Sequence, residues 1–384
     1  MIAFNMQPLA SGNLTGIGYY AANVMKELIP VLDEDYELHV FDYIGRNGAA
    51  PMLQKHLGGS FDENKLHTVT SMPLSLYIRT GNLGRIFPYE KLTKSSADLT
   101  VFYNFLCPLG VTGDNVITIY DMVCERYPGT MDGRNRRLLR RYLRPSAENA
   151  SAIITISEFS KREICELLNV PQEKVRVAYC GVDTDIYCPF ASEKEEISGR
   201  AYLERTYGIG RYILYVGTLE PRKNIVTIVK AFDKIASKHP DVKLVLAGGI
   251  GWKSEETLKT IAGSPFTERI VKTGYISDDD KKLLYRAAEF FVFPSLYEGF
   301  GMPVTEAMAC GTPAVIADTS SLPEASGGIA PKAAPDDVSG FADLFDGILS
   351  GRTALPSRDE LIRSASQFKW SNAARVYNDT FGVL

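Results

Sequence analysis

Short apolar runs alternate with longer amphipathic stretches along nearly the whole chain. The apolar runs have the length of β-strands, and the stretches between them have the length and periodicity of α-helices. In the first half we predict strands at residues 2–5, 37–41, 66–69, 99–102, 116–119, 152–156 and 175–178, and helices near 17–30, 133–149 and 158–169. This alternation is typical of strand–helix–strand units around a parallel sheet, so the pattern predicts an α/β protein.

The same pattern begins again after an interruption. Residues 182–208 are polar and carry a mixed run of charges, so we interpret them as a linker between domains. Beyond them we predict buried strands at 212–216, 243–247, 270–273, 290–293 and 314–316. We therefore expect two Rossmann-like domains, residues 1–190 and 205–368, with a last helix at 370–384 that packs back on the first. Because ligands bind beyond the carboxyl ends of parallel strands, we expect the two parallel sheets to face a deep interdomain cleft.

The composition narrows the class of protein. With 384 residues, 45% of them hydrophobic and 23% charged, the chain is long enough for two cores and too hydrophobic to be disordered. A formal charge of -4 argues against a nucleic acid partner. The chain does not begin with a signal-peptide pattern, and no window approaches about 18 consecutive apolar residues, so we expect a cytoplasmic location. The six cysteines form no Cys-x-x-Cys pair and no Cys/His cluster with metal-ligand spacing, which predicts reduced thiols and no bound metal.

The most informative stretch is residues 295–313, SLYEGFGMPVTEAMACGTP, directly after a predicted strand. Gly301 lets the backbone approach a ligand, Pro303 suits the first turn of a helix, and Gly311 suits its end. The start of such a helix attracts phosphate, while Glu298 and Glu306 can accept hydrogen bonds from sugar hydroxyls. The alternative is that Glu298 is solvated and Glu306 only favours the start of the helix.

The spacing of Glu298 and Glu306 within this string closely resembles the signature of the retaining family 4 glycosyltransferases, which have the two-domain GT-B fold. A second block, Gly217-Thr-Leu-Glu-Pro-Arg222-Lys223-Asn, resembles the V-G-x-x-x-x-R-K-N block of that family. The resemblance implies that Arg222 and Lys223 hold the diphosphate of the donor, which suits a guanidinium fork and an ammonium point charge. Without the resemblance, a solvated basic helix start would be the better explanation of this pair.

The loop at residues 271–277 resembles the segment that contacts the nucleobase in the family, so Tyr275 and Ile276 are candidates for base binding. The alternative for Tyr275 is packing against a neighbouring helix. The donor-binding residues that the resemblance implies are Gly217, Thr218, Phe300, Gly301, Met302, Glu306, Tyr275 and Ile276.

In the first half, Gly16 and Gly18 follow the first strand in a Gly-Ile-Gly-Tyr sequence that resembles the G-I-G-R-Y phosphate and acceptor loop of the family, with Tyr19 in place of Arg. The third glycine of a dinucleotide fingerprint is missing, which makes a dehydrogenase a poor alternative.

Tyr120 and Asp121 end another predicted strand. Many members of the family have a His where this chain has Tyr120. A His general base is therefore not supported, and Asp121 is the nearby ionisable group. We expect the Tyr120 exchange to change the preference for the donor sugar, or the contact at its C6, without abolishing transfer.

Six arginines fall within residues 134–144, where they alternate with leucines in an otherwise acidic protein. A helix there would have a strongly cationic face. One interpretation is that the arginines lie in water while the leucines dock on the sheet. The other is peripheral contact with anionic lipid, or with the pyrophosphate of a lipid-linked acceptor, through Arg134, Arg137 and Arg141.

The resemblance implies a retaining, metal-independent hexosyltransferase of the mannosyl or glucosyl type. Its co-substrate would be a GDP- or UDP-linked sugar without a further cofactor, and its acceptor a glycan or a polyprenyl-diphosphate-linked glycan. Glu298, Arg222, Lys223, Asp121 and Tyr120 would form the catalytic set. The expected setting is assembly of lipopolysaccharide, capsule or exopolysaccharide, in the cytoplasm or on the inner face of the membrane. The alternatives are a GT-B epimerase or phosphorylase, and a catalytically silent protein that binds a nucleotide sugar.

Overall fold

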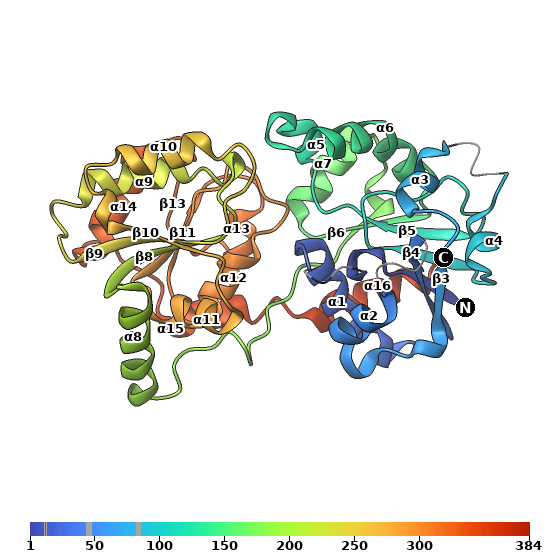
Figure 1. Cartoon of the computed structure of the whole chain (residues 1–384), viewed down its shortest axis with the longest axis horizontal. Helices are drawn as coiled ribbons and strands as arrows, with labels where there is room; N and C mark the ends of the chain where they lie inside the picture. The colour runs from blue at the N-terminus through green and yellow to red at the C-terminus, as the bar shows by residue number, and fades with distance from the viewer. Residues whose placement is uncertain (11, 13, 44–47, 82–85) are drawn as a thin grey trace. The chain divides into compact units, whose positions relative to one another are not determined.

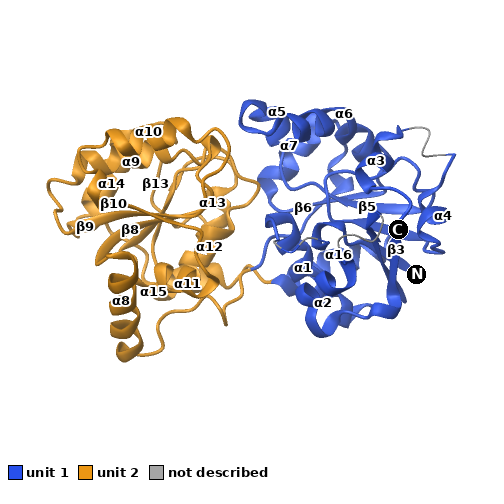
Figure 2. Cartoon of the chain, viewed as in Figure 1, with its two compact units in different colours: residues 1–181, 370–384 blue, residues 182–369 orange. Residues whose placement is uncertain are grey.

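The computed structural model describes residues 1–10, 12, 14–43, 48–81 and 86–384, which form two compact units (Figure 2). Unit 1 comprises residues 1–181 and 370–384, and unit 2 comprises residues 182–369. Each unit has its own parallel sheet with helices on both faces (Figure 1). The predicted α/β class is therefore confirmed.

The sheet of unit 1 has seven parallel strands in the order β3-β2-β1-β4-β5-β6-β7. The strands are β1 (Ile2–Asn5), β2 (Tyr36–Phe41), β3 (Leu66–Val69), β4 (Leu99–Phe102), β5 (Asp114–Thr118), β6 (Ala152–Thr155) and β7 (Val175–Val177). The direction in which strands are added reverses between β1 and β4. A reversal of this kind opens a crevice at the carboxyl ends of the two strands, where ligands bind.

Helices cover both faces of this sheet, with α1 and α16 on one side and α6 and α7 on the other (Figure 1). The helices of unit 1 are α1 (Gly16–Leu28), α2 (Ala49–Leu57), α3 (Leu74–Arg79), α4 (Tyr89–Thr93), α5 (Val123–Arg126), α6 (Gly133–Asn149), α7 (Glu158–Leu168) and α16 (Trp370–Phe381). The hydroxyl of Ser157 accepts a hydrogen bond from the Ser160 amide at 3.0 Å and so caps α7.

The sheet of unit 2 has six strands in the order β10-β9-β8-β11-β12-β13, and its order reverses between β8 and β11. The strands are β8 (Arg211–Val216), β9 (Val242–Ala247), β10 (Ile270–Gly274), β11 (Phe290–Phe293), β12 (Ala314–Ala317) and β13 (Lys332–Ala333). The sequence did not predict β13, because a strand of two residues shows no periodicity. The helices are α8 (Glu193–Tyr207), α9 (Ile225–Ile235), α10 (Glu255–Gly263), α11 (Asp278–Ala287), α12 (Met302–Ala309), α13 (Leu322–Ala325), α14 (Val338–Leu349) and α15 (Arg358–Ala365).

The prediction of a linker at residues 182–208 is wrong, because much of this stretch forms α8 and all of it belongs to unit 2. Only a narrow part of α8 contacts the rest of the unit, so its sequence has no wide apolar stripe. Leu203 is buried, and the bare Cα of Gly199 faces Leu283 and Phe190, where a Cβ would lie 3.1 Å from both side chains. Arg200 donates to the Ala287 carbonyl at 2.9 Å. A polar helix with one small contact patch therefore looks like a linker in the sequence.

The last helix, α16, completes the core of unit 1. The Tyr377 hydroxyl lies 2.7 Å from the Thr118 hydroxyl, and Phe381 meets Phe4 with ring centroids 6.0 Å apart. Where the chain returns to the unit, a Cβ on Gly181 would lie 2.4 Å from the Trp370 nitrogen, so this position requires glycine. Among the described residues, no helix is long and apolar enough to cross a membrane.

Replacing Tyr377 by Phe tests this packing. The Tyr377–Thr118 pair is buried, so the substitution leaves a buried hydroxyl on Thr118 without this partner. We expect the free energy of unfolding to fall by about 1–3 kcal/mol, measured by denaturant unfolding followed by tryptophan fluorescence. Tyr275→Phe is the matched control, since 91% of Tyr275 is exposed, and it should leave the free energy unchanged. Equal stability of the two variants would contradict the assigned packing.

Candidate functional site

In unit 2, the loops that follow β8 and β11 are joined at the carboxyl edge of the sheet, where the strand order reverses. The Leu296 amide donates to the Arg222 carbonyl at 2.8 Å, and the Arg222 guanidinium donates to the Tyr297 carbonyl at 2.7 Å. Asn224, with a left-handed backbone, donates to the carbonyls of Pro294 and Pro335. These bonds bring the two blocks that the sequence singled out into one site.

Four charged side chains form the loop ion cluster at this edge: Glu220, Arg222, Lys223 and Glu298. Glu298 accepts from Arg222 at 2.8 Å and from Lys223 at 2.6 Å, and Arg222 also pairs with Glu220 at 2.9 Å. The exposed fraction is 19% for the Arg222 side chain and 14% for Lys223. The interpretations of a solvated Glu298 and a solvated basic helix start are therefore both wrong. Arg222 and Lys223 lie in a short 3-10 turn, Pro221–Lys223, that precedes α9.

The protonation of the loop ion cluster follows from burial and charge together. Burial acts to raise the pKa of Glu298, but Arg222 and Lys223 outweigh it and lower that pKa to about 2. Burial lowers the pKa of Lys223. Glu298 is thus a carboxylate at neutral pH. It can accept hydrogen bonds and balance positive charge, but it has no proton to donate.

The helix α12 begins directly beside the loop ion cluster. Gly301, its N-cap, has a φ of 117°, and a Cβ there would lie 2.9 Å from Leu322. Because glycine has no side chain to cap the first turn, the amides at the start of α12 are left to other acceptors. Phe300 is buried and packs against Phe368, with ring centroids 5.1 Å apart, and this contact fixes the position of the turn. Met302 is the first residue of the helix.

Glu306 is also buried, one turn into α12. It accepts from the Tyr285 hydroxyl at 2.9 Å and from the Lys281 ammonium at 3.3 Å. Both partners come from α11, whose start is capped by Ser277, with Asp278, Asp279 and Asp280 in its first turn. Glu306 is therefore held as a hydrogen-bond acceptor at a defined place.

The other donor-binding candidates lie in the loops after β8 and β10. Gly217 has a φ of 151° and packs so closely on Gly248 that a Cβ at residue 248 would lie 2.1 Å from the Gly217 carbonyl oxygen. Thr218 follows in the same loop. Tyr275, just beyond β10, is exposed, whereas Ile276 packs partly into the core. Packing of Tyr275 against a neighbouring helix is thus excluded, and its ring can stack on a ligand.

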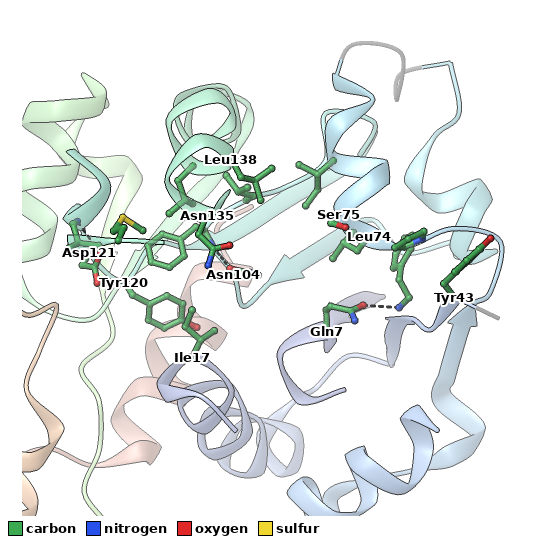
Figure 3. Close-up of a pocket in the computed structure, with 18 residues that line it drawn as sticks. Gln7, Ile17, Tyr43, Leu74, Ser75, Asn104, Tyr120, Asp121, Asn135 and Leu138 are labelled. Carbon is green, nitrogen blue, oxygen red and sulfur yellow. Dashed lines mark hydrogen bonds between the residues drawn. The ribbon is translucent and has the colours of Figure 1, made fainter. Parts of the chain in front are cut away.

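Unit 1 has a pocket of about 660 Å³ at the carboxyl ends of β1, β2, β4 and β5, beneath α3 and α6 (Figure 3). Tyr120 and Asp121 lie at one end of the pocket and Tyr43 at the other. The lining is mainly apolar, with polar groups from Gln7, Ser75, Asn104, Asp121 and Asn135. The sequence analysis missed Gln7, Asn104 and Asn135. Gln7 and Asn104 lie two residues beyond the ends of predicted strands, which is the signal that could have found them.

Tyr120 turns its ring toward the pocket and its hydroxyl away from it. The hydroxyl donates to the Tyr103 carbonyl at 3.2 Å, and the ring contacts Tyr20 and Phe105. Burial raises the pKa of Tyr120 well above its ordinary value, so the phenol stays neutral. Asp121 accepts from the Val123 amide at 3.0 Å, which orders the turn at the pocket wall.

The glycine loop before α1 is described only in part, since residues 11 and 13 lie outside the described residues. Gly16 is the first residue of α1, and no atom lies within 4 Å of where its Cβ would be. Gly18 is packed tightly, because a Cβ there would lie 2.8 Å from the Pro8 carbonyl oxygen. The hydroxyl of Thr15 caps the helix at the Gly18 amide.

The predicted basic helix is α6, and its arginines are exposed while Leu139 and Leu143 are buried. Arg144 donates to the carbonyls of Leu167 and Leu168 at the end of α7, so it has a structural role. Arg134, Arg137 and Arg141 line a shallow cavity of about 250 Å³ together with Arg79, Leu138 and Tyr142. Within the described part of the chain, no carboxylate forms an ion pair with these three arginines of α6.

A third group of side chains lies outside both regions. Glu37, His39 and His67 bring their side-chain ligand atoms within 4.8 Å of one another. This group contradicts no spacing pattern in the sequence, because His67 is far from Glu37 and His39 along the chain.

Two family models match separate parts of the chain. The model described as "Glycosyl transferases group 1" matches residues 205–367, and the model described as "Glycosyltransferase Family 4" matches residues 104–186. The first range contains the loop ion cluster, and the second contains Tyr120 and Asp121.

Individual proteins agree with these matches. The chain is 31% identical to the O-antigen chain mannosyltransferase B of Escherichia coli over 271 residues, which are 70% of each chain. It is 30% identical to the serotype-specific mannosyltransferase WbdA of Escherichia coli over 242 residues, which are 62% of this chain and 29% of that protein. The structure of Anabaena HepE in complex with UDP and glucose aligns with 100% of this chain and 99% of its own, with a TM-score of 0.71 and 18% identity.

The low pKa of Glu298 predicts how stability depends on pH. A carboxylate whose pKa falls on folding stabilises the native state above its unfolded pKa, near 4.5, and loses this contribution as the pH falls toward about 2. At pH 7, Glu298→Gln should lower the free energy of unfolding by about 3–5 kcal/mol, since it leaves Lys223 without its ion-pair partner. Calorimetric melts should show this difference shrinking between pH 4.5 and pH 2.

Glu289→Gln is the matched control, because Glu289 pairs with Arg211 at a more exposed position. It should cost about 0–1 kcal/mol. If wild type and Glu298→Gln kept parallel pH profiles, the assigned ion pairs of Glu298 would be wrong.

Proposed function

Because the chain belongs to the group 1, family 4 glycosyltransferases and has the GT-B fold, we propose that it transfers a mannosyl residue from a nucleoside diphosphate sugar to a glycan, with retention of anomeric configuration. The family resemblance found in the sequence is thereby confirmed, and with it an enzyme that transfers a glycosyl unit. We favour mannose over glucose because the O-antigen chain mannosyltransferase B and the serotype-specific mannosyltransferase WbdA are among the relatives of this chain.

The loop ion cluster is the observation that carries the donor side of the proposal. Loss of a nucleoside diphosphate develops negative charge on the leaving phosphate, and the groups that stabilise it best are donors already held in place. Arg222 and Lys223 are held in the turn before α9, with Glu298 occupying the position of an anion between them. In our proposal the donor diphosphate binds these cations in place of Glu298. It also accepts hydrogen bonds from the amides of Gly301 and Met302.

The two glutamates and Tyr275 then have distinct roles. Released from part of its ion pairs, Glu298 accepts hydrogen bonds from hydroxyls of the donor sugar. Glu306, held by Tyr285 and Lys281, binds the ribose. Tyr275 stacks on the base of a GDP- or UDP-linked sugar, with Ile276 and the close-packed turn of Gly217 and Thr218 beside it. HepE was solved with UDP and glucose, which makes a UDP-linked sugar the natural second donor to test.

The pocket of unit 1 is the proposed site for the acceptor. Apolar walls suit the faces of sugar rings, and its few amide and hydroxyl groups suit their hydroxyls. Asp121 at one end orients the acceptor hydroxyl, and Gly16 lets the start of α1 approach the substrates, while Gly18 lets the same turn pack on Pro8. From the family resemblance we propose front-face attack, in which the acceptor oxygen bonds to the anomeric carbon, the bond to the diphosphate breaks and the departing phosphate takes the proton of the acceptor. This reaction needs neither a metal nor a further cofactor.

Two measurements test this function. Thermal-shift screening with GDP-mannose, UDP-glucose, UDP-galactose and ADP-glucose identifies the donor, since a ligand raises the melting temperature of the protein that binds it. Transfer to O-antigen-type glycan acceptors is then followed by mass spectrometry, and NMR reports the anomeric configuration of the product. We expect Lys223→Gln to lower kcat by about 10²–10³-fold, because a charge that stabilises the leaving phosphate is lost.

Lys238→Gln is the control variant, because Lys238 is largely exposed and pairs with Asp346 elsewhere in unit 2; it should keep wild-type kcat. Donor binding without transfer to any acceptor would instead establish a catalytically silent binding protein. Product formed without an acceptor, or only with free phosphate, would indicate an epimerase or a phosphorylase. An inverted product would overturn retention.

We also propose that the acceptor is lipid-linked and that α6 contacts an anionic membrane on the cytoplasmic side. The cationic group of Arg134, Arg137 and Arg141 is joined to α3, because the Tyr142 hydroxyl donates to the Arg79 carbonyl at 3.2 Å. Leu76, on α3, is exposed, and so are the apolar side chains of Ile86 and Phe87 further along the chain. Cationic and apolar side chains on one surface suit the headgroups and the upper acyl region of a bilayer.

Vesicle binding tests this surface. The triple variant Arg134→Gln, Arg137→Gln, Arg141→Gln should lose most sedimentation with vesicles of phosphatidylglycerol at low salt, at about 1 kcal/mol per basic residue. The control is Arg200→Gln, Arg205→Gln, which removes charge from α8 in unit 2 and should bind as wild type does. If wild type fails to sediment with anionic vesicles, or sediments equally with neutral ones, the membrane contact is overturned.

A further inference from the structure

The two histidines and the glutamate noted above share one face of the unit 1 sheet at its β3 edge. Glu37 and His39 are two residues apart on β2, so both point to the same side. His67 on β3 pairs directly with His39 in the parallel register. Glu37 and His39 are buried, and about a third of the His67 side chain is exposed. The group is therefore reachable from solvent only through the edge strand.

The ligand atoms of the three side chains converge. His39 Nε2 lies 3.0 Å from Glu37 Oε1, and His67 Nε2 lies 3.3 Å from Glu37 Oε2. A tetrahedral ion with bonds of about 2.0–2.1 Å places neighbouring ligand atoms roughly 3.3 Å apart. The two imidazole rings have centroids 5.6 Å apart and are inclined by 56°, so they approach the carboxylate from different directions.

The second ring nitrogen of each histidine and the carboxylate of Glu37 also have hydrogen-bond partners. His67 Nδ1 lies 3.1 Å from the Thr93 carbonyl, and His39 Nδ1 lies 3.1 Å from the Tyr89 hydroxyl. Ser95 donates to Glu37 Oε1. Metal-binding histidines nearly always have such a partner on the second ring nitrogen, which selects the tautomer and orients the ring.

The position of His67 adds an independent observation. A carbonyl oxygen only accepts, so His67 Nδ1 must carry the proton that bonds to Thr93. With Nδ1 engaged by Thr93, Nε2 is the ring atom that faces the carboxylate oxygen of Glu37, which is the orientation that a shared ion between the two side chains requires.

We propose that Glu37, His39 and His67 bind a divalent transition-metal ion, with zinc as the best match to two imidazoles and a carboxylate. The ligand atoms are Nε2 of both histidines and an oxygen of Glu37, and water or the Ser95 hydroxyl completes the coordination. The ion joins β2 to the edge strand β3 and so stabilises unit 1. None of its ligands lines the unit 1 pocket or belongs to the loop ion cluster, so its role is structural.

Zinc binding to the full chain tests the proposal. Protein stripped with a chelator is titrated with Zn²⁺ at pH 7.5 by isothermal titration calorimetry after alkylation of accessible thiols, and Co²⁺ binding is followed by visible absorption. We expect one ion per chain, an intense tetrahedral Co²⁺ band, and a higher melting temperature with zinc. His67→Ala, at the most exposed ligand, should abolish all three. Tyr89→Phe keeps the ligands but removes the partner of His39, and should weaken zinc affinity about 10–100-fold.

His239→Ala is the matched control, because His239 also pairs with a carboxylate, Asp346, but in unit 2. It should bind zinc as wild type does. The proposal is overturned if wild type shows no saturable zinc site, or if His67→Ala binds zinc with unchanged stoichiometry and affinity. The first result would mean that the three side chains only form hydrogen bonds with one another. Because these readouts do not involve sugar transfer, they are independent of the proposed function.

Discussion

The ion pairs of Glu298 with Arg222 and Lys223 are the constraint on which the proposed donor site of unit 2 depends. Burying any one of these three charges alone would be costly. Together they compensate one another, as long as the loops after β8 and β11 keep their relative positions. That register in turn places Gly301 and the start of α12 beside two cations. The charge of Glu298 thus balances the site in the absence of ligand, in the position where an anionic ligand is proposed to bind.

The two units use the same sheet architecture for different chemistry. At the reversal of strand order, unit 2 presents charged groups and free helix amides, whereas unit 1 presents a pocket with mainly apolar walls and a few amides. A diphosphate and a sugar ring call for those two surfaces respectively. The helix α16, at the end of the chain, also belongs to unit 1. The core of unit 1 is therefore complete only when residues that precede unit 2 in the sequence pack against residues that follow it.

Much of the fold was accessible from local patterns. The long buried strands and the helices α1, α6 and α7 lie where periodicity predicted them, because a repeat of two or 3.6 residues is a property of neighbouring positions. The predictions failed where an element was very short or where only a narrow part of its surface was buried. Strand β13 has two residues, and α8 touches its unit mainly through Gly199 and Leu203. Contacts so small leave almost no trace in the order of polar and apolar residues.

By itself, the sequence determined the α/β class, the two-part organisation and the family, since these follow from periodicity and from the short strings around Glu298 and Lys223. Only the tertiary structure decided which partners these residues have. Lys223 meets Glu298 across 75 positions of sequence, and His67 meets Glu37 because β3 lies beside β2. The structure likewise turned the Tyr120 hydroxyl into the core and left Tyr275 exposed. Such contacts depend on strand order and burial, which are set by the packing of the whole unit.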